Sequence, residues 1–180
     1  MQHTAVVDSP LGEMLLAGDE AGLTGLWFAG QKYFGAGLQP GAAQAEAAEI
    51  PALAAARRWL DVYFSGREPD FLPPLHLVGT PFRVCVWRQL LKIPYGETIT
   101  YGALAARVAR AQGLPRMSAQ AVGGAVGHNP ISVIVPCHRV VGADGSLTGY
   151  AGGVDRKAKL LEMEGADRAR LYIPDRGTAL

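Results

Sequence analysis

The sequence lacks an apolar segment long enough to cross a membrane. Its uninterrupted apolar runs are only a few residues long, whereas a membrane-spanning helix needs roughly 20 apolar residues. The N-terminus also lacks the basic and then apolar pattern of a secretory signal peptide. We therefore expect an intracellular, cytoplasmic protein that neither spans nor binds a membrane.

Cysteine is scarce, and no metal-binding pattern is present. The chain has two cysteines, Cys85 and Cys137, and four histidines, with no Cys-x-x-Cys or similar ligand spacing. A disulfide between the two cysteines would consume Cys137, which is the better candidate for a nucleophile. The sequence thus predicts no metal site.

Charge is segregated along the chain, although the 180 residues have a net charge of only +1. Residues 1–80 carry 4 Lys/Arg and 9 Asp/Glu, a net charge of −5, whereas residues 81–170 carry 12 and 6, a net charge of +6. A basic half beside an acidic half indicates that a polyanion docks to one end of the protein. By itself this is only a weak indication of nucleic-acid binding.

The first half of the chain has the pattern of a small sheet with one helix. Three short apolar runs, at 4–9, 13–17 and 23–28, are separated by turn residues and predict a three-stranded antiparallel meander. The Gly/Ala/Pro-rich segment 35–44 is expected to be an irregular loop. A proline opens a predicted helix over about 51–64. Its core-facing positions are Leu53, Ala56, Leu60 and Phe64.

Helix signals dominate the second half. Residues 70–79 contain two adjacent prolines and are expected to form an extended linker or an edge strand. Thr80 and Pro81 then provide an N-cap and a first-turn proline for a helix. Cys85, within this helix, is interpreted as a packing residue rather than as a second nucleophile. The core-facing positions are Phe82, Val86, Leu90 and Leu91.

Two further helices are predicted across a tight turn. Thr100 caps a helix over about 101–111, and Ser118 caps another that ends at about Gly127. Between them a Gly-Leu-Pro sequence breaks the helical pattern. Two short helices in this arrangement form a helix-turn-helix.

The second of these helices is rich in glycine, with Gly123, Gly124 and Gly127 among alanines. Each internal glycine costs about 1 kcal/mol relative to alanine, so the glycines do not serve stability. Close packing against a neighbouring helix is one explanation. The other is that a helix without bulky side chains can approach the narrow minor groove of DNA.

A candidate nucleophile follows the helix-turn-helix. The β-branched run 133–135 predicts a short buried strand, which Pro136 ends. Cys137 and His138 follow directly, and an imidazole that accepts the thiol proton would activate the sulfur near neutral pH. This requires the backbone to bend after Pro136 so that His138 can face the sulfur. The alternative is a buried structural cysteine beside a surface histidine.

The surroundings of this pair resemble one protein family. Segments 120–130 (QAVGGAVGHNP), 136–140 (PCHRV), 149–153 (GYAGG) and 160–165 (LLEMEG) together resemble the methylated-DNA–protein-cysteine methyltransferases, or O6-alkylguanine-DNA alkyltransferases. The match is specific over about residues 79–165 and looser before them.

The resemblance implies an α/β fold in two domains. Residues 1–79 would form a small antiparallel-sheet-plus-helix, RNase H-like domain that buttresses the second. Residues 80–170 would form a mostly helical, winged-helix-like DNA-binding domain, and 171–180 a C-terminal tail. No cofactor is implied, and the structural zinc of some relatives is not expected because the first 80 residues contain no cysteine.

The resemblance also assigns catalytic roles. Cys137 would be the alkyl acceptor, His138 the base that takes its proton through a water, and Glu164 the carboxylate that orients the imidazole. Asn129 would be the hinge residue that holds the recognition helix to the active-site segment. Tyr101 would donate to the flipped purine, although an aromatic residue at a helix start could equally pack on the core.

Further residues are assigned to the substrate pocket and to DNA. The pocket would be formed by Val126, Val140, Tyr150 and Ala151, and many relatives have serine in place of Ala151. The recognition helix would enter the minor groove. Its Gln120 stands where many relatives have an arginine that fills the space of the flipped nucleotide. The DNA-contacting residues would be Gln120, Ala121, Gly123, Gly124 and Arg139. Arg139 could instead hold the fold by pairing with a carboxylate.

The implied function is DNA repair on double-stranded DNA by a monomer. The protein would flip O6-alkylguanine, and O4-methylthymine as well, out through the minor groove and transfer the alkyl group irreversibly to Cys137. Each molecule would act once, as a suicide enzyme. Two alternatives are a lesion binder, against which the presence of Cys137 argues, and a cysteine hydrolase, which would turn over repeatedly and would leave the glycine-rich helix unexplained.

Overall fold

The computed structural model describes residues 1–175, which form two compact units. The first comprises Met1–Val78 together with Pro130–Ile134, and the second comprises 79–129 and the residues from 135 onward. The division near residue 79 lies where the sequence suggested a boundary. Segment 130–134, in contrast, belongs to the first unit, although it was expected in the second. Of the expected tail 171–180, residues 176–180 lie outside the described part of the chain.

A four-stranded sheet forms the centre of the first unit. Strands β1 (His3–Val7), β2 (Met14–Asp19) and β3 (Gly22–Phe28) form the predicted antiparallel meander, which is confirmed. A short strand, β4 (Ala43–Gln44), pairs in parallel with β1 and gives the order β3-β2-β1-β4. Segment 35–44 is thus not irregular throughout, because its end joins the sheet.

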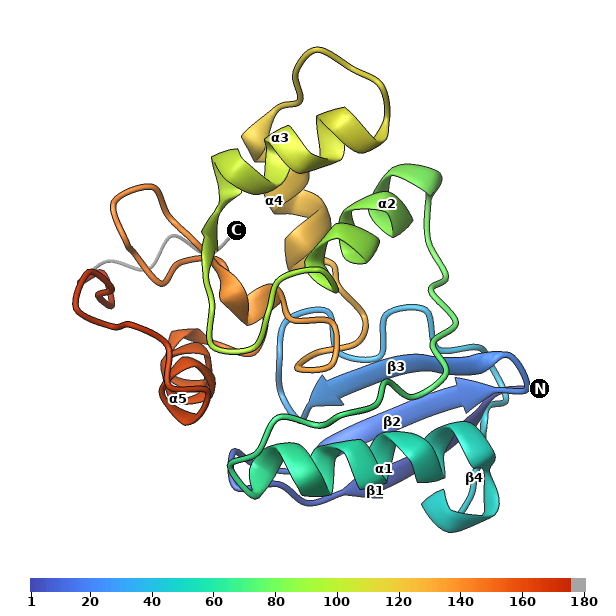
Figure 1. The fold of residues 1–180 in the computed structure, drawn as a ribbon. Helices are drawn as coiled ribbons and strands as arrows, with labels where there is room; N and C mark the ends of the chain where they lie inside the picture. Colours follow the sequence, from blue (N-terminus) through green and yellow to red (C-terminus); the bar gives the residue numbers. More distant parts are fainter. Residues whose placement is uncertain (176–180) are drawn as a thin grey trace. The chain divides into compact units, whose positions relative to one another are not determined.

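One helix lies along a face of this sheet (Figure 1). A short 3-10 turn, η1 (Ala47–Glu49), leads to α1 (Pro51–Phe64), whose predicted bounds are confirmed. Leu53, Ala56 and Leu60 are buried as predicted, whereas Phe64 is half-buried and its neighbour Tyr63 is buried instead.

Strand β3 also holds two segments from outside the meander. The extended chain after α1 pairs with it where Leu23 N donates to Pro74 O and His76 N donates to Leu23 O, both at 2.8 Å. Segment 130–134 pairs at Leu26, whose amide donates to Pro130 O and whose carbonyl accepts from Ser132 N. These bonds explain why 130–134 belongs to the first unit.

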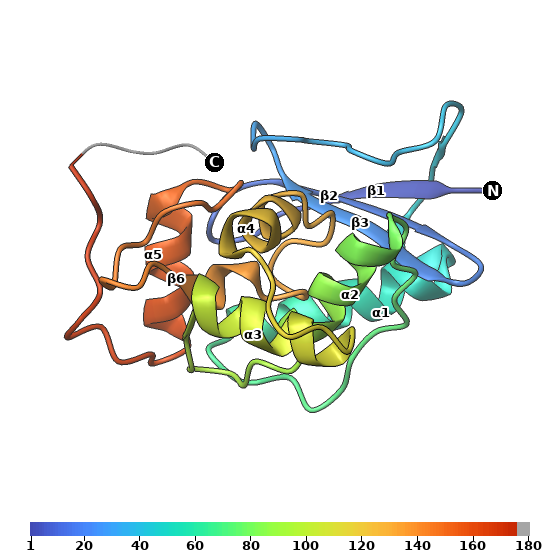
Figure 2. The ribbon, with the colours of Figure 1, turned by 90° about the horizontal axis from the view of Figure 1, so that it is seen from above.

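Three helices form most of the second unit: α2 (Pro81–Leu90), α3 (Tyr101–Ala111) and α4 (Ala119–Gly127). All three predicted N-caps are confirmed, because the hydroxyls of Thr80, Thr100 and Ser118 accept from backbone amides three residues ahead. The predicted helix-turn-helix is therefore α3 and α4, seen from above in Figure 2.

The buried face of α2 differs in part from the prediction. Val86 and Leu90 are buried as expected, but Trp87 and Gln89 are buried too, while Phe82 and Leu91 are only half-buried. Trp87 faces α4, because its indole Nε1 donates to Ala125 O at 2.9 Å. The burial of Trp87 thus joins α2 to the helix-turn-helix.

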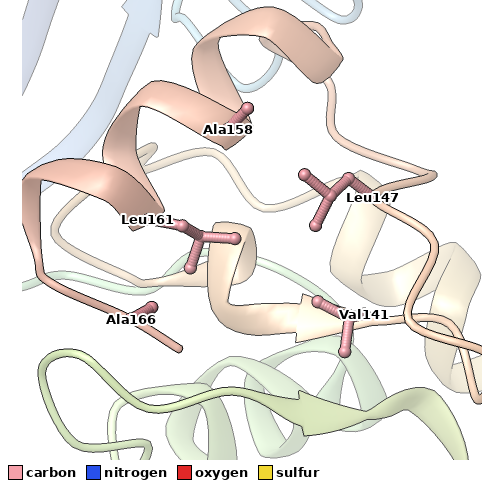
Figure 3. Packing of buried hydrophobic residues seen from close by; sticks show 5 residues of the cluster. All are labelled: Val141, Leu147, Ala158, Leu161 and Ala166. Atoms are coloured by element: carbon pink, nitrogen blue, oxygen red, sulfur yellow. The ribbon is translucent and has the colours of Figure 1, made fainter. Parts of the chain in front are cut away.

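A small sheet and a last helix complete the second unit. Strand β5 (Ile99–Thr100) pairs in parallel with β6 (Val140–Val141), and α5 (Val154–Met163) packs beside β6. Apolar side chains from β6, the loop after it, α5 and the turn beyond α5 form one cluster (Figure 3). Its members are Val141, Leu147, Ala158, Leu161 and Ala166.

The strand predicted at 133–135 is wrong. These residues lie in consecutive turns, with Val133 at a φ of 69°, and Cys137–Arg139 form a 3-10 helix, η2, before β6 begins. The run is apolar because all three residues are buried, and burial alone does not distinguish a strand from a buried turn. The bend expected after Pro136 is present as η2.

Candidate active site

Cys137 lies at the start of η2 and is only 5% exposed. The carboxamide of buried Asn129, just beyond α4, donates from Nδ2 to Cys137 Sγ at 3.2 Å and to Val135 O at 2.8 Å. Asn129 thereby connects the end of α4 to the turn that carries the sulfur.

His138 and Glu164 form a buried pair beside the cysteine. His138 Nε2 lies 2.7 Å from Glu164 Oε1, and both side chains are fully buried. His138 Nδ1 has no hydrogen-bond partner among residues 1–175. Burial lowers the pKa of His138 despite the opposing effect of Glu164. A neutral imidazole that donates from Nε2 to the carboxylate would leave a lone pair on Nδ1 for a proton.

Glu164 is held by several donors. Arg139 donates from Nε to Oε2 at 2.9 Å and from a terminal nitrogen to Oε1 at 3.0 Å, and Gly96 N donates to Oε2 at 3.1 Å. Burial alone would raise the pKa of Glu164, but the bonds and charges of His138 and Arg139 outweigh it and hold that pKa well below its usual range. The carboxylate is therefore ionised at neutral pH.

The guanidinium of Arg139 makes its hydrogen bonds inside the protein. Besides its two bonds to Glu164, it donates to Ile93 O at 2.6 Å, and its guanidinium lies 5.7 Å from the centre of the Tyr95 ring. Only 8% of the residue is exposed. These contacts favour the carboxylate-pairing alternative for Arg139 over the DNA contact.

The thiol of Cys137 is held in its neutral form. Burial raises the pKa of Cys137, and the Asn129 hydrogen bond and the charge of Lys157 oppose this in part. A thiolate must then be generated by proton transfer to a base within the site, and His138 is next to it in the chain.

Lys157 is a buried cation that the sequence interpretation missed. Its Nζ donates to the carbonyls of Val140 and Thr148, and the residue is fully buried. Tyr101 also donates to Thr148 O, at 3.1 Å, so both side chains hold the segment that follows β6. Burial lowers the pKa of Lys157 to about 8. The available signal was a lysine on the apolar face of α5, beside Leu160 and Leu161.

The predicted pocket residues lie in the same unit as the cysteine. Val126, Val140 and Tyr150 are buried and Ala151 is half-buried. The Tyr150 ring meets the His138 ring edge to face, with centres 6.4 Å apart. The carbonyl of Val140 accepts a hydrogen bond from Lys157 Nζ.

The predicted DNA-contacting residues of α4 divide between two faces. Gln120, Ala121 and Gly124 are exposed, whereas Gly123 is buried. A Cβ on Gly124 would meet no atom within 4 Å. Gly123 thus fits the close-packing explanation for the glycines, and Gly124 fits the explanation of an open, flat surface.

Two absences complete the description. Within residues 1–175, no group of three or more His, Cys, Asp or Glu side chains could hold a metal ion. No helix in that part of the chain is long and apolar enough to cross a bilayer.

Sequence comparison matches both halves of the chain to one family. Residues 81–166 match the model described as the 6-O-methylguanine DNA methyltransferase DNA-binding domain, and residues 3–77 match the ribonuclease-like domain of the same enzymes. A methylated-DNA–protein-cysteine methyltransferase of Mycobacterium bovis is 45% identical over 91% of this chain and 93% of its own. One of Methanosarcina acetivorans is 44% identical, over 91% and 99%.

Solved structures agree with the sequence comparison. The structure of Mycobacterium tuberculosis OGT in complex with DNA has a TM-score of 0.77 and 42% identity, over 91% of this chain and 92% of that one. The M. tuberculosis O6-methylguanine methyltransferase also has a TM-score of 0.77, with 43% identity over 98% and 97%.

Fold and site together define a class: a methyltransferase with a ribonuclease-like domain, a helical DNA-binding domain and a cysteine at its centre. The chain belongs to the methylated-DNA–protein-cysteine methyltransferase family of DNA-repair enzymes.

Proposed function

We propose that this protein repairs O6-alkylguanine in double-stranded DNA by transferring the alkyl group irreversibly to Sγ of Cys137. The observation that carries the proposal is the buried thiol next to a histidine whose Nε2 is bound to an ionised carboxylate and whose Nδ1 can accept a proton. An acid–base pair of this kind generates a sulfur nucleophile at neutral pH.

The reaction is a displacement at a saturated carbon. His138 takes the Cys137 proton through a water, and the thiolate forms the S–C bond as the C–O6 bond breaks. The electron pair of the broken bond goes to the purine, which must be neutralised as it leaves. Tyr101 donates a hydrogen bond to the purine as negative charge develops on it, and the proton taken from the thiol neutralises the purine anion. Burial raises the pKa of Tyr101, so the phenol keeps its proton and acts as a hydrogen-bond donor. To bond to the purine, its hydroxyl would exchange the bond that it makes to Thr148 O.

Access to the lesion requires base flipping. The target carbon lies inside the duplex, and extruding the nucleotide costs a few kcal/mol. The exposed face of α4, with Gln120, Ala121 and Gly124, lies in the minor groove, and Gln120 occupies the space that the flipped nucleotide leaves. Val126, Val140, Tyr150 and Ala151 receive the base. The same pocket would take O4-methylthymine.

The protein acts once and as a monomer in the cytoplasm. The thioether on Cys137 is stable, and the proposed reaction includes no step that regenerates the thiol. Because the buried thiol lies within one unit of a single chain, one molecule suffices for one transfer.

The test is an intact-mass measurement after incubation with a duplex containing O6-methylguanine. We expect the mass of the protein to rise by one methyl group, and the Cys137→Ser variant to gain none while it binds the duplex within a few-fold of wild type. Methyl transfer by Cys137→Ser would overturn the mechanism.

A further inference from the structure

Several basic side chains of the second unit pair with no carboxylate among residues 1–175, and four of these line two hollows around α3. The four are Lys92 after α2, Arg107 and Arg110 on α3, and Arg116 in the loop between α3 and α4. All are exposed except Arg107, which is half-buried. Their charges are therefore available to an anion from outside the chain.

These side chains border two adjoining cavities. The first, of about 340 Å³, is lined by Gln89, Lys92, Arg107 and Arg110. The second, of about 370 Å³, is lined by Arg110, Arg116 and apolar residues of α3 and the loop. Arg110 lines both, so the cavities follow one another across α3. We call Gln89, Lys92, Arg107, Arg110 and Arg116 the basic strip.

Gln89 adds an uncharged polar side chain to the strip. The residue is only 8% exposed, and its carboxamide makes no hydrogen bond to another described residue. It stands on the buried face of α2 beside Leu90, where an apolar side chain would cost less. Gln89 lines the first cavity together with three cationic side chains, and a carboxamide N–H beside cations suits an oxygen anion.

The order of the residues indicates a polymeric anion. Arg and Lys groups recur along two successive cavities, as a chain of phosphodiesters requires. The strip ends at Arg116, two residues before Ser118, the N-cap of α4. It therefore continues toward the helix whose exposed face we assign to DNA.

We propose that the basic strip binds the phosphodiester backbone of the duplex beyond the lesion while α4 lies against the minor groove. This inference rests on the proposed function. The strip increases the affinity for DNA without contacting the reacting atoms.

The test compares two double variants that remove the same charge. Arg107→Gln/Arg110→Gln alters the strip, and Lys159→Gln/Arg170→Gln removes two exposed cations elsewhere in the same unit. Affinity for an unmodified duplex is measured by fluorescence anisotropy over a range of salt concentrations. Binding weakens as salt rises, and each phosphate contact contributes about 0.9 to the steepness of log K against log salt. We expect the strip variant, which loses two contacts, to have a plot that is less steep by about 2. The control variant should leave the slope near that of wild type.

Three further measurements make the result specific. Arg107→Lys/Arg110→Lys should restore the slope, and the wild type and the strip variant should bind equally once the duplex is too short to reach the strip. Inorganic phosphate at constant ionic strength should not displace the duplex. An unchanged slope, an equal loss in the control variant, or displacement by free phosphate would overturn the proposal.

Failure of the proposed chemistry would be seen separately. Transfer from free O6-benzylguanine to Cys137 needs no duplex, and we expect both double variants to react with it at the wild-type rate. Loss of this reaction in the wild type itself would contradict the proposed function, whereas a slower reaction in the strip variant alone would show that Arg107 and Arg110 serve the fold and would overturn the strip.

Discussion

At the scale of single residues, the Glu164 carboxylate accepts hydrogen bonds from three other residues. One carboxylate fixes the tautomer of His138, neutralises Arg139 and accepts from the Gly96 amide. The three donors come from η2 and from the turn after α2, so Glu164 joins segments that lie far apart in the chain.

Replacing Glu164 by Gln should lower stability in a pH-dependent way. The pKa of Glu164 is lowered in the folded protein, so its stabilisation is present above its ordinary pKa of 4.5 and is lost as the pH falls below it. We expect Glu164→Gln to lower the free energy of unfolding by on the order of 3 kcal/mol at neutral pH. Urea unfolding at several pH values should show this difference shrinking below about pH 4.5.

The same variant should shift the pH profile of alkyl transfer. Without the charged carboxylate the imidazolium is less stable and the thiolate–imidazolium pair is less populated. The thiolate then forms by loss of the thiol proton to solvent, which requires a higher pH. The readout is the rate with free O6-benzylguanine from acid to alkaline pH. A profile that coincides with wild type, even in a less stable protein, would mean that Glu164 serves the fold alone.

Lys157 predicts a second rise of stability with pH, in the alkaline range. Its folded pKa of about 8 lies below its ordinary value of 10.5, so between these values the unfolded chain binds more protons and stability rises with pH. Relative to Lys157→Met, the wild type should therefore gain free energy of unfolding from about pH 8 to 10.5. Parallel curves for the two proteins would contradict the assignment.

At the scale of elements, α4 combines a buried face with an exposed face that lacks bulk. Gly124 lies on the exposed face, where an added Cβ meets nothing within 4 Å. Gly124→Ala should therefore raise the free energy of unfolding by about 1 kcal/mol, because glycine disfavours a helix interior.

The same methyl group should impair the function assigned to α4. A Cβ at position 124 would stand between the helix backbone and the groove, so transfer from duplex DNA should slow while transfer from free O6-benzylguanine does not. If the stabilised variant repaired duplex DNA at the wild-type rate, close approach of α4 to DNA would be excluded.

Elements with local signals could be predicted, and those with distant partners could not. The hydroxyl caps at Thr80, Thr100 and Ser118 set the starts of three helices from residues within one turn. Strand β4 exists only because it pairs with β1, some forty residues away, and 133–135 is apolar because it is buried in turns. Neither the pairing of β4 nor the turns at 133–135 can be predicted from the neighbouring residues alone.

The site shows the same limit. Cys137, His138, Asn129 and Glu164 could be named because their motifs resemble a family. Lys157 was missed because its hydrogen-bond partners are the backbone carbonyls of Val140 and Thr148. Backbone atoms are present at every residue, so no sequence motif predicts such a contact.

At the scale of the whole molecule, the charge of the second half is partly internal. Of the 12 Lys/Arg in residues 81–170, Arg139 and Lys157 are buried in the site, as is the opposing Glu164. The cations left at the surface include the basic strip, whereas the first 80 residues have a net charge of −5. The charge available to DNA is therefore concentrated in the unit that carries Cys137.

The central claim is that one molecule accepts one alkyl group, on Cys137. It is tested most directly by titrating the protein with an excess of duplex carrying O6-methylguanine labelled in the methyl group, counting the guanines restored and locating the label by peptide mapping. Cys85, a free and half-buried thiol on α2, is an internal control. We predict that repair stops at one equivalent and that all label is on Cys137. Continued turnover, or label on Cys85, would contradict the account.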